Sequence, residues 1–126
     1  MRAIDTNVLV RLLARDDARQ VAAAERFVQG GAWVSHLVLM ETAWVLESVY
    51  DMAPDRITTA VEMLLGHTHL TLEKAEVVVA AVAEFRKRPK LGFSDCLIVE
   101  AARKAGCAPL GTFDRELSKL ADVQRL

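Results

Sequence analysis

The stretch MRAIDTNVLV, residues 1–10, decides the start of the fold. Its first apolar run stops at Asp5, two small polar residues follow, and a second apolar pattern begins at Val8. This order predicts a short buried strand that passes directly into a helix capped by Thr6 or Asn7. In an open parallel sheet, ligands bind at the carboxyl end of a strand, where a switch in strand order leaves a crevice. Asp5 is therefore a candidate site residue, and the alternative is that Asp5 itself caps the helix.

Helices and short strands alternate along the rest of the chain. Strands are expected at residues 3–4, 32–35, 70–72, 108–110 and 123–126, and helices at 8–14, 37–50, 54–65 with Pro54 in the first turn, 73–88, 94–104 and 114–120. One more helix is expected after residue 14: Asp16 or Asp17 can cap it, Gly30-Gly31 closes it, and its apolar face carries Val21, Ala24, Phe27 and Val28. Such alternation predicts an α/β fold, a three-layer α/β/α sandwich around a mostly parallel, five-stranded sheet. No linker or repeat interrupts the pattern, so residues 1–126 are expected to form a single domain.

The composition indicates a globular protein without a general attraction for polyanions. The chain has 126 residues and a formal net charge of -1, so a nucleic acid would have to be held by local cations or a metal ion. Asp5 lies too close to the start for a secretory signal, and no apolar run approaches the roughly 18 residues of a membrane span. Cys96 and Cys107 predict reduced core thiols, Trp33 and Trp44 are expected in the core, and the protein is expected in the cytoplasm.

Three further acids stand in settings like that of Asp5. Glu41 lies inside a strongly apolar predicted helix, so its carboxylate is expected to face away from open water, where an unpaired charge is costly. Asp95 stands in the first turn of a predicted helix, and Asp114 follows a predicted strand and a turn. The alternatives are an arginine partner for Glu41 and favourable helix capping by Asp95 and Asp114.

The predicted topology allows the four acids to meet. Asp5 and Asp114 follow strands, whereas Glu41 and Asp95 lie near the starts of helices that leave strands, and in a parallel sheet these junctions share one edge. Four converging carboxylates would repel one another strongly unless a divalent cation neutralised them. Sites built only from carboxylate oxygens favour Mg²⁺ or Mn²⁺ over zinc or copper. Such ions can activate water for attack on a phosphodiester.

Four blocks of sequence surround these acids: IDTNVLV at 4–10, ET at 41–42, GFSDCLI at 92–98 and GTFD at 111–114. Together and in this order, they resemble the PIN-domain ribonucleases, and most closely the VapC-type toxins of bacterial toxin–antitoxin pairs. The resemblance covers essentially the whole chain. Asp-Thr-Asn alone is a weak signal, whereas all four blocks in order are a strong one.

The resemblance implies a metal-dependent endoribonuclease that hydrolyses RNA phosphodiester bonds and leaves a 5′-phosphate. The implied ligands of Mg²⁺ or Mn²⁺, which are also the catalytic acids, are Asp5, Glu41, Asp95 and Asp114. Asn7 and Thr112 would support them by orienting carboxylates or water. The implied partners are an RNA substrate, a cognate antitoxin protein and a second copy of the chain in a homodimer.

Departures from the family pattern are small. Ser94 and Cys96 replace the alanines that are usual around the third acid, and Glu116 stands where the family often has aspartate. None of these changes removes an implied ligand, so only the role of Glu116 is left open.

Basic residues near the predicted acids are candidate contacts for the RNA backbone. A cationic run shortly before the third acid could hold phosphates: Arg86, Lys87, Arg88 and Lys90. The alternative is a solvated helix end, where cations suit the helix dipole. Arg11 and Arg15, one helical turn apart after Asp5, are further candidates.

Two other functions compete with RNA cleavage. The first is a PIN-like module that binds RNA or a partner without cutting; such family members lose acids, whereas this chain keeps all four. The second is a phosphatase of the haloacid dehalogenase type, which also places an aspartate after its first strand. That family needs a second acid two residues later, where Asn7 stands here, and a downstream lysine motif that is not found.

Overall fold

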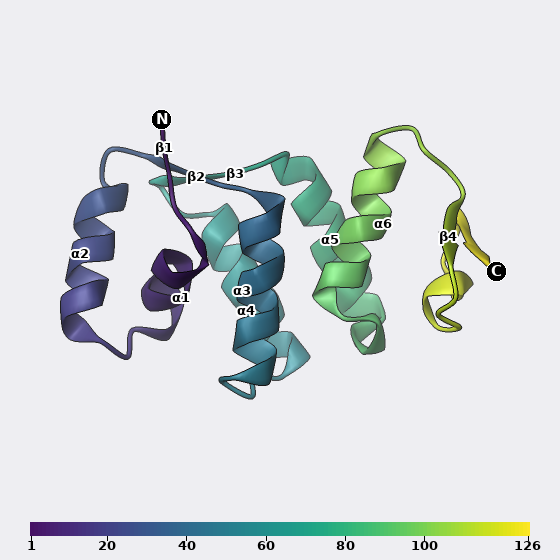
Figure 1. Ribbon diagram of the computed structural model, residues 1–126, viewed down its shortest axis with the longest axis horizontal. Helices are drawn as coiled ribbons and strands as arrows, with labels where there is room; N and C mark the ends of the chain where they lie inside the picture. The colour runs from purple at the N-terminus through teal and green to yellow at the C-terminus, as the bar shows by residue number, and fades with distance from the viewer. The chain divides into compact units, whose positions relative to one another are not determined.

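The computed structural model describes all 126 residues as two compact units, residues 1–75 and 76–126, each of which is described by itself (Figure 1). No helix in either unit combines the length and apolar character that crossing a membrane requires.

The first unit is built on a parallel three-stranded sheet. Its order is β1 (Arg2–Ala3), β2 (Ala32–Val34) and β3 (Leu70–Leu72). The alternation of side chains is regular in β2 and β3, where the first and last residues are buried and the middle residue is exposed. Ile4 N donates to Trp33 O at 3.2 Å, so the β1–β2 pairing continues to the residue before Asp5.

Two helices lie in sequence between each pair of these strands. They are α1 (Thr6–Ala14) and α2 (Ala18–Val28) after β1, and α3 (His36–Ser48) and α4 (Pro54–Leu65) after β2. Of the two caps expected for α2, Asp16 and Asp17, the structure has Asp17, whose carboxylate accepts from Gln20 N at 3.1 Å. Helix α1 packs against α2 and α3, and α3 packs against α4. The buried side chains of α1 and α3 therefore form part of one core.

The second unit contains a helix pair and a two-stranded parallel sheet. Its elements are α5 (Ala75–Lys87), the short 3₁₀ helix η1 (Pro89–Leu91), α6 (Phe93–Lys104), β4 (Leu110–Thr112), the 3₁₀ helix η2 (Leu117–Lys119) and β5 (Val123–Arg125). The rings of Phe85 and Phe93 meet edge to face with centroids 6.0 Å apart, and Lys104 Nζ lies 3.5 Å from Glu76 Oε1. These contacts at both ends make α5 and α6 antiparallel neighbours.

The predicted α/β class with parallel strands is confirmed, and all five expected strands are present. They form one three-stranded and one two-stranded sheet, where a single five-stranded sheet was expected. The boundaries of the fourth strand are wrong by two residues: β4 begins at Leu110, whose N–H donates to Asp122 O at 2.8 Å. Pro109 has no N–H to donate, so the ladder cannot begin there with a backbone donor. The helix expected at 114–120 is reduced to η2. The prediction of a single domain stays a prediction.

Several expected core residues are exposed. The exposed fraction is 38% for Trp33 and 64% for Trp44, and Cys107 is also exposed, whereas Cys96 is fully buried. Trp33 is the middle residue of β2, so strand alternation turns it to the opposite face from Ala32 and Val34. The hydrophobic side chains of Trp33 and Trp44 alone therefore did not predict which face of the strand or helix is buried by packing.

Candidate functional site

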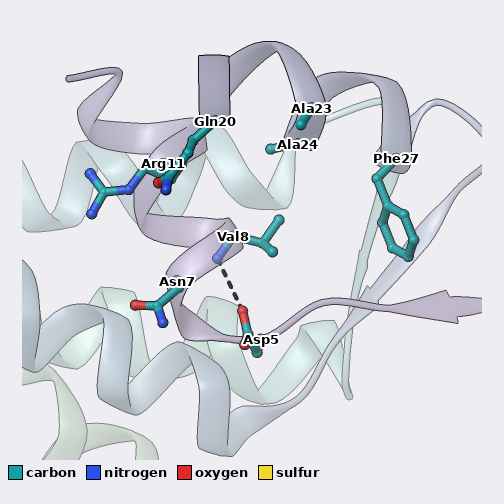
Figure 2. Close-up of a pocket in the computed structure, with 8 residues that line it drawn as sticks. All are labelled: Asp5, Asn7, Val8, Arg11, Gln20, Ala23, Ala24 and Phe27. Carbon is teal, nitrogen blue, oxygen red and sulfur yellow. Dashed lines mark hydrogen bonds between the residues drawn. The ribbon is translucent and has the colours of Figure 1, made fainter. Parts of the chain in front are cut away.

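Asp5 both follows β1 and caps α1. Its Oδ1 accepts a hydrogen bond from Val8 N at 3.1 Å, shown by the dashed line in Figure 2. The alternative that Asp5 itself caps the helix is confirmed, because its extended backbone aims the carboxylate at the free N–H groups. The prediction that Thr6 or Asn7 is the cap is wrong, because both residues already belong to the first turn. The side chain of Asp5 is exposed. Capping uses one carboxylate oxygen and leaves the other available to a ligand.

Helix α3, which carries Glu41, is fixed at its start to the end of β3. Ser35 Oγ accepts from Val38 N at 3.1 Å, and Glu73 Oε1 accepts from His36 N at 2.8 Å. His36 Nε2 lies 2.6 Å from Glu73 O, and because a carbonyl can only accept, Nε2 carries a proton there. The first turn of α3 is therefore held by both side chains and backbone.

Glu41 itself is exposed, so the expectation that its carboxylate faces away from water is wrong. The exposed fractions of Leu37 and Trp44, one turn before and after it, are 74% and 64%. Apolar side chains extend around the whole of α3, and for that reason the sequence pattern could not identify the open face. The next residue, Thr42, is buried, and its Oγ1 has no hydrogen-bond partner.

Asp95 lies within the electrostatic influence of Asp114 in the second unit. Asp95 lies half-buried in the first turn of α6. Burial raises the pKa of Asp95, and the negative charge of Asp114 raises it further. Two like charges in one region favour a proton or a cation, as expected for a pair of ligands.

Asp114 is positioned by two local hydrogen bonds just after β4. Its Oδ1 accepts from Leu117 N at 2.9 Å, and its own N–H donates to Thr112 Oγ1 at 3.0 Å. The alternative that Asp114 caps the following turn is thus realised, and Thr112 directly holds the segment that carries it. One oxygen of the carboxylate remains, as in Asp5.

The two units divide the predicted acids between them, with Asp5 and Glu41 in the first and Asp95 and Asp114 in the second. Within neither unit do three or more His, Cys, Asp or Glu side chains form a group that could hold a metal ion. The prediction that four acids share one site therefore stays a prediction. The donor set fits a hard cation, since each acid offers only oxygen.

Comparison with known proteins identifies the family. The model of the PIN domain matches residues 3–123, which is nearly the whole chain. The chain belongs to the PIN domain family. No curated protein matches the sequence.

One solved structure similar to this PIN domain is the crystal structure of Mycobacterium tuberculosis VapC20, described as a Sarcin-Ricin loop cleaving toxin. The two sequences are 20% identical, the match covers 98% of this chain and 97% of the other, and the TM-score is 0.43.

The two predicted cations of the first unit are held by acids of this PIN domain. Arg11 forms an ion pair with Asp16 and donates to Tyr50 Oη at 3.3 Å, while Tyr50 Oη donates to Asp16 Oδ2 at 2.8 Å. Arg15 pairs with Glu25, with Nη2 and Oε1 2.8 Å apart. Sequence reasoning missed the role of Tyr50, because no local signal connects it with residues 34 or more positions earlier. These ion pairs weaken the case for Arg11 and Arg15 as RNA contacts, which stays untested.

The basic run of the second unit lines a small cavity. The cavity has a volume of about 250 Å³, and its lining includes Lys87, Arg88 and Lys90 of the run together with Glu116. Arg88 Nε lies 4.0 Å from Glu84 Oε2, and Lys119 Nζ lies 3.1 Å from Glu116 Oε1. The run spans the last turn of α5 and η1, so both the helix-end interpretation and a role in binding phosphates fit its position.

A second cavity, of about 400 Å³, lies beside Asp5 and Asn7 in the first unit (Figure 2). Phe27 on α2 forms part of its wall. The sequence pattern places Phe27 on the apolar face of α2, and its exposed fraction is 40%. Three residues of its lining, Asp5, Asn7 and Arg11, were expected at the site from the sequence, whereas the α2 side of the cavity was not.

Proposed function

We propose that this PIN domain is a Mg²⁺- or Mn²⁺-dependent endoribonuclease and the toxin of a VapC-type toxin–antitoxin pair. The observation that carries the proposal is the position of two acids. Asp5 is separated from the end of β1 by one residue, Ile4, and Asp114 is separated from the end of β4 by one residue, Phe113. Each belongs to a parallel sheet, so each lies at the carboxyl end of its strand, where ligands bind in such folds. Membership of the PIN domain family and the presence of all four acids in order support it.

The proposed ligands of the metal are Asp5, Glu41, Asp95 and Asp114. A bound divalent cation would supply a water activated for attack and positive charge for the phosphodiester. The chain itself fixes two carboxylates by local hydrogen bonds, from Val8 N to Asp5 and from Leu117 N to Asp114. Asn7 and Thr112 are proposed as supporting groups. Positions fixed in advance reduce the reorganisation that binding requires.

The proposed partners follow from the resemblance of the sequence to VapC-type toxins. They are an RNA substrate, an antitoxin protein and a second copy of the chain in a homodimer, and the proposed location is the cytoplasm. Arg86, Lys87, Arg88 and Lys90 are proposed to contact RNA phosphates, with Arg11 and Arg15 as weaker candidates.

The test combines RNA cleavage with metal binding. Cleavage should require Mg²⁺ or Mn²⁺, stop with a chelator, and be abolished by Asp5→Asn, Glu41→Gln or Asp95→Asn; Asp114→Asn should be milder if that acid acts through water. The same ions should raise the melting temperature of the wild type, because a ligand that binds only the folded state stabilises it. Glu47→Gln, which removes an exposed carboxylate elsewhere on α3, is the matched control and should change neither result.

Three results would contradict the proposal. Full activity in Asp5→Asn, Glu41→Gln or Asp95→Asn would remove that acid from the site. Restoration of activity by zinc alone would contradict the argument from oxygen ligands. RNA binding without any cleavage would favour a non-cleaving module.

A further inference from the structure

The cavity beside Asp5 has the size and lining of a small-ligand site. Its volume of about 400 Å³ lies within the range of roughly 300–1,000 Å³ that is typical of such sites. Apolar side chains from both helices form one part of the lining, namely Val8, Ala23, Ala24 and Phe27. The amide side chains of Asn7 and Gln20 form another part, on α1 and α2 respectively (Figure 2).

Phe27 is held in place from outside the cavity. The guanidinium carbon of Arg2 lies 4.8 Å from the centre of the Phe27 ring, and Arg2 Nη1 donates to Phe27 O at 3.3 Å. Arg2 thus covers one face of the ring, and a planar ligand could stack only on the other. A ring fixed in this way loses little conformational entropy when a ligand stacks on it.

The charges around the cavity favour an uncharged ligand. The guanidinium group of Arg11 is already bound by Asp16 and Tyr50, so it is poorly available to a phosphate. The carboxylate of Asp5 would repel an anion. An aromatic wall with amide donors and acceptors matches a nucleobase, which has a planar face and polar edges. An apolar side chain of a protein partner would contact only the apolar wall and would leave the two amide groups without hydrogen-bond partners.

We propose that this cavity binds one unstacked nucleobase of the RNA, with Phe27 as the stacking surface and the amides of Gln20 and Asn7 contacting its edge. The inference rests on the proposed function in one respect: Asp5 lines the cavity, so the bound base would lie next to the phosphate that is cut. The cavity would then set a preference for one base beside the cleavage site.

Binding can be tested without cleavage or metal. The probes are adenosine, cytidine, guanosine and uridine, which carry no phosphate, titrated while the side-chain amide signals of Asn7 and Gln20 are followed by NMR. We expect these signals to move, with at least a severalfold difference in affinity among the four nucleosides. Phe27→Leu keeps the apolar wall but removes the aromatic ring, and should weaken binding about fivefold or more. Gln20→Ala should weaken it and reduce discrimination.

Gln29→Ala is the matched control, because Gln29 is the C-cap of α2 and does not line the cavity. It should leave nucleoside binding unchanged. Equal binding of all four nucleosides with no effect of Phe27→Leu would overturn the proposal. Binding of an apolar helical peptide at the same signals, with none of any nucleoside, would overturn it in favour of a protein-docking groove.

Cleavage assays separate this inference from the proposed function. The wild type and Phe27→Leu are compared on RNAs that differ in one base beside the cut, and the preference should weaken in the variant. Metal-dependent cleavage with an unchanged preference would overturn the base site and leave the proposed function intact. Nucleoside binding without any RNA cleavage would support the base site and overturn the proposed function.

Discussion

Asp5 combines a structural and a proposed catalytic role in one side chain. Its Oδ1 caps α1 through Val8 N, and its second oxygen is the one proposed to bind a metal. The two roles depend on different properties of the residue, since capping needs a hydrogen-bond acceptor whereas metal binding needs a charge. Substitutions at this residue can therefore separate them.

We expect Asp5→Asn to abolish cleavage without loss of stability, because asparagine is about as good an N-cap as aspartate. Asp5→Ala should abolish cleavage and also lower the free energy of unfolding by about 1 kcal/mol. Urea unfolding of both variants without divalent ions gives the measurement. Equal stability of the two variants would show that the hydrogen bond to Val8 contributes nothing in solution.

Asp16 is kept ionised by its neighbours. The hydrogen bond from Tyr50 and then that from Arg11 lower the pKa of Asp16 below its ordinary value. Because its folded pKa lies below the unfolded one, the contribution of Asp16 to stability is present above the unfolded pKa. That contribution is lost as the pH falls through the folded pKa.

Tyr50→Phe should therefore raise the pKa of Asp16 toward its ordinary value and lessen the acid-dependent loss of stability. Carbon-13 NMR titration of the Asp16 carboxyl group measures the first effect, with the adjacent Asp17 carboxyl as internal control. An Asp16 titration identical in both proteins would contradict the hydrogen-bond network.

At the scale of elements, helix starts could be predicted well because their signals are local. Asp17 before α2 and Pro54 at the start of α4 are short-range signals, and both were interpreted correctly. For the cap of α1 the sequence left Asp5 open beside Thr6 or Asn7, and the structure has Asp5. Ser35, which caps α3, was expected at the end of the preceding strand. The exposure of Glu41 could not be predicted, because the face of α3 that packs is set by tertiary contacts.

The cap of α3 offers a test of how firmly Glu41 is positioned. Ser35→Ala removes the acceptor for Val38 N and should lower the free energy of unfolding by about 1 kcal/mol, whereas Ser35→Asp should largely restore it. Ser48→Ala is the matched control at the other end of the helix, where an exposed hydroxyl donates to Trp44 O at 2.7 Å. If the free energy of unfolding falls equally in Ser35→Ala and Ser48→Ala, the Ser35 cap stabilises α3 no more than an ordinary surface hydroxyl does.

At the scale of the whole molecule, the sequence predicted the class of fold, the five strands and the family, each of which depends on order along the chain. It did not predict the cavity beside Phe27 or the Arg11–Asp16–Tyr50 network. Both depend on residues that are distant in sequence and adjacent only after packing. The predicted convergence of the four acids also depends on residues that are distant in sequence. Its test therefore needs variants in both units.

The basic run belongs to this scale as well, because its effect on RNA is carried by charge rather than by shape. If Arg86, Lys87, Arg88 and Lys90 contact phosphates, replacing all four with alanine should weaken RNA binding without changing the position of the cut. On single-stranded RNA, each lost contact should flatten the slope of log affinity against log salt by about 0.7. Affinities are measured on an Asp95→Asn background, so that the RNA survives the titration.

Arg56→Ala is the control for this measurement, since it removes an exposed cation on α4 and should leave the slope unchanged. Lys90→Ala alone should flatten the slope by about 0.7, the effect of one lost phosphate contact. Lys90 lines the cavity of the basic run, and each phosphate contact releases counterions independently. An unaltered slope in the quadruple variant would show that the run is only a solvated end of α5, where cations suit the helix dipole. The phosphate contacts would then have to come from other cations, and Arg11 and Arg15 could supply them only by giving up their ion pairs with Asp16 and Glu25.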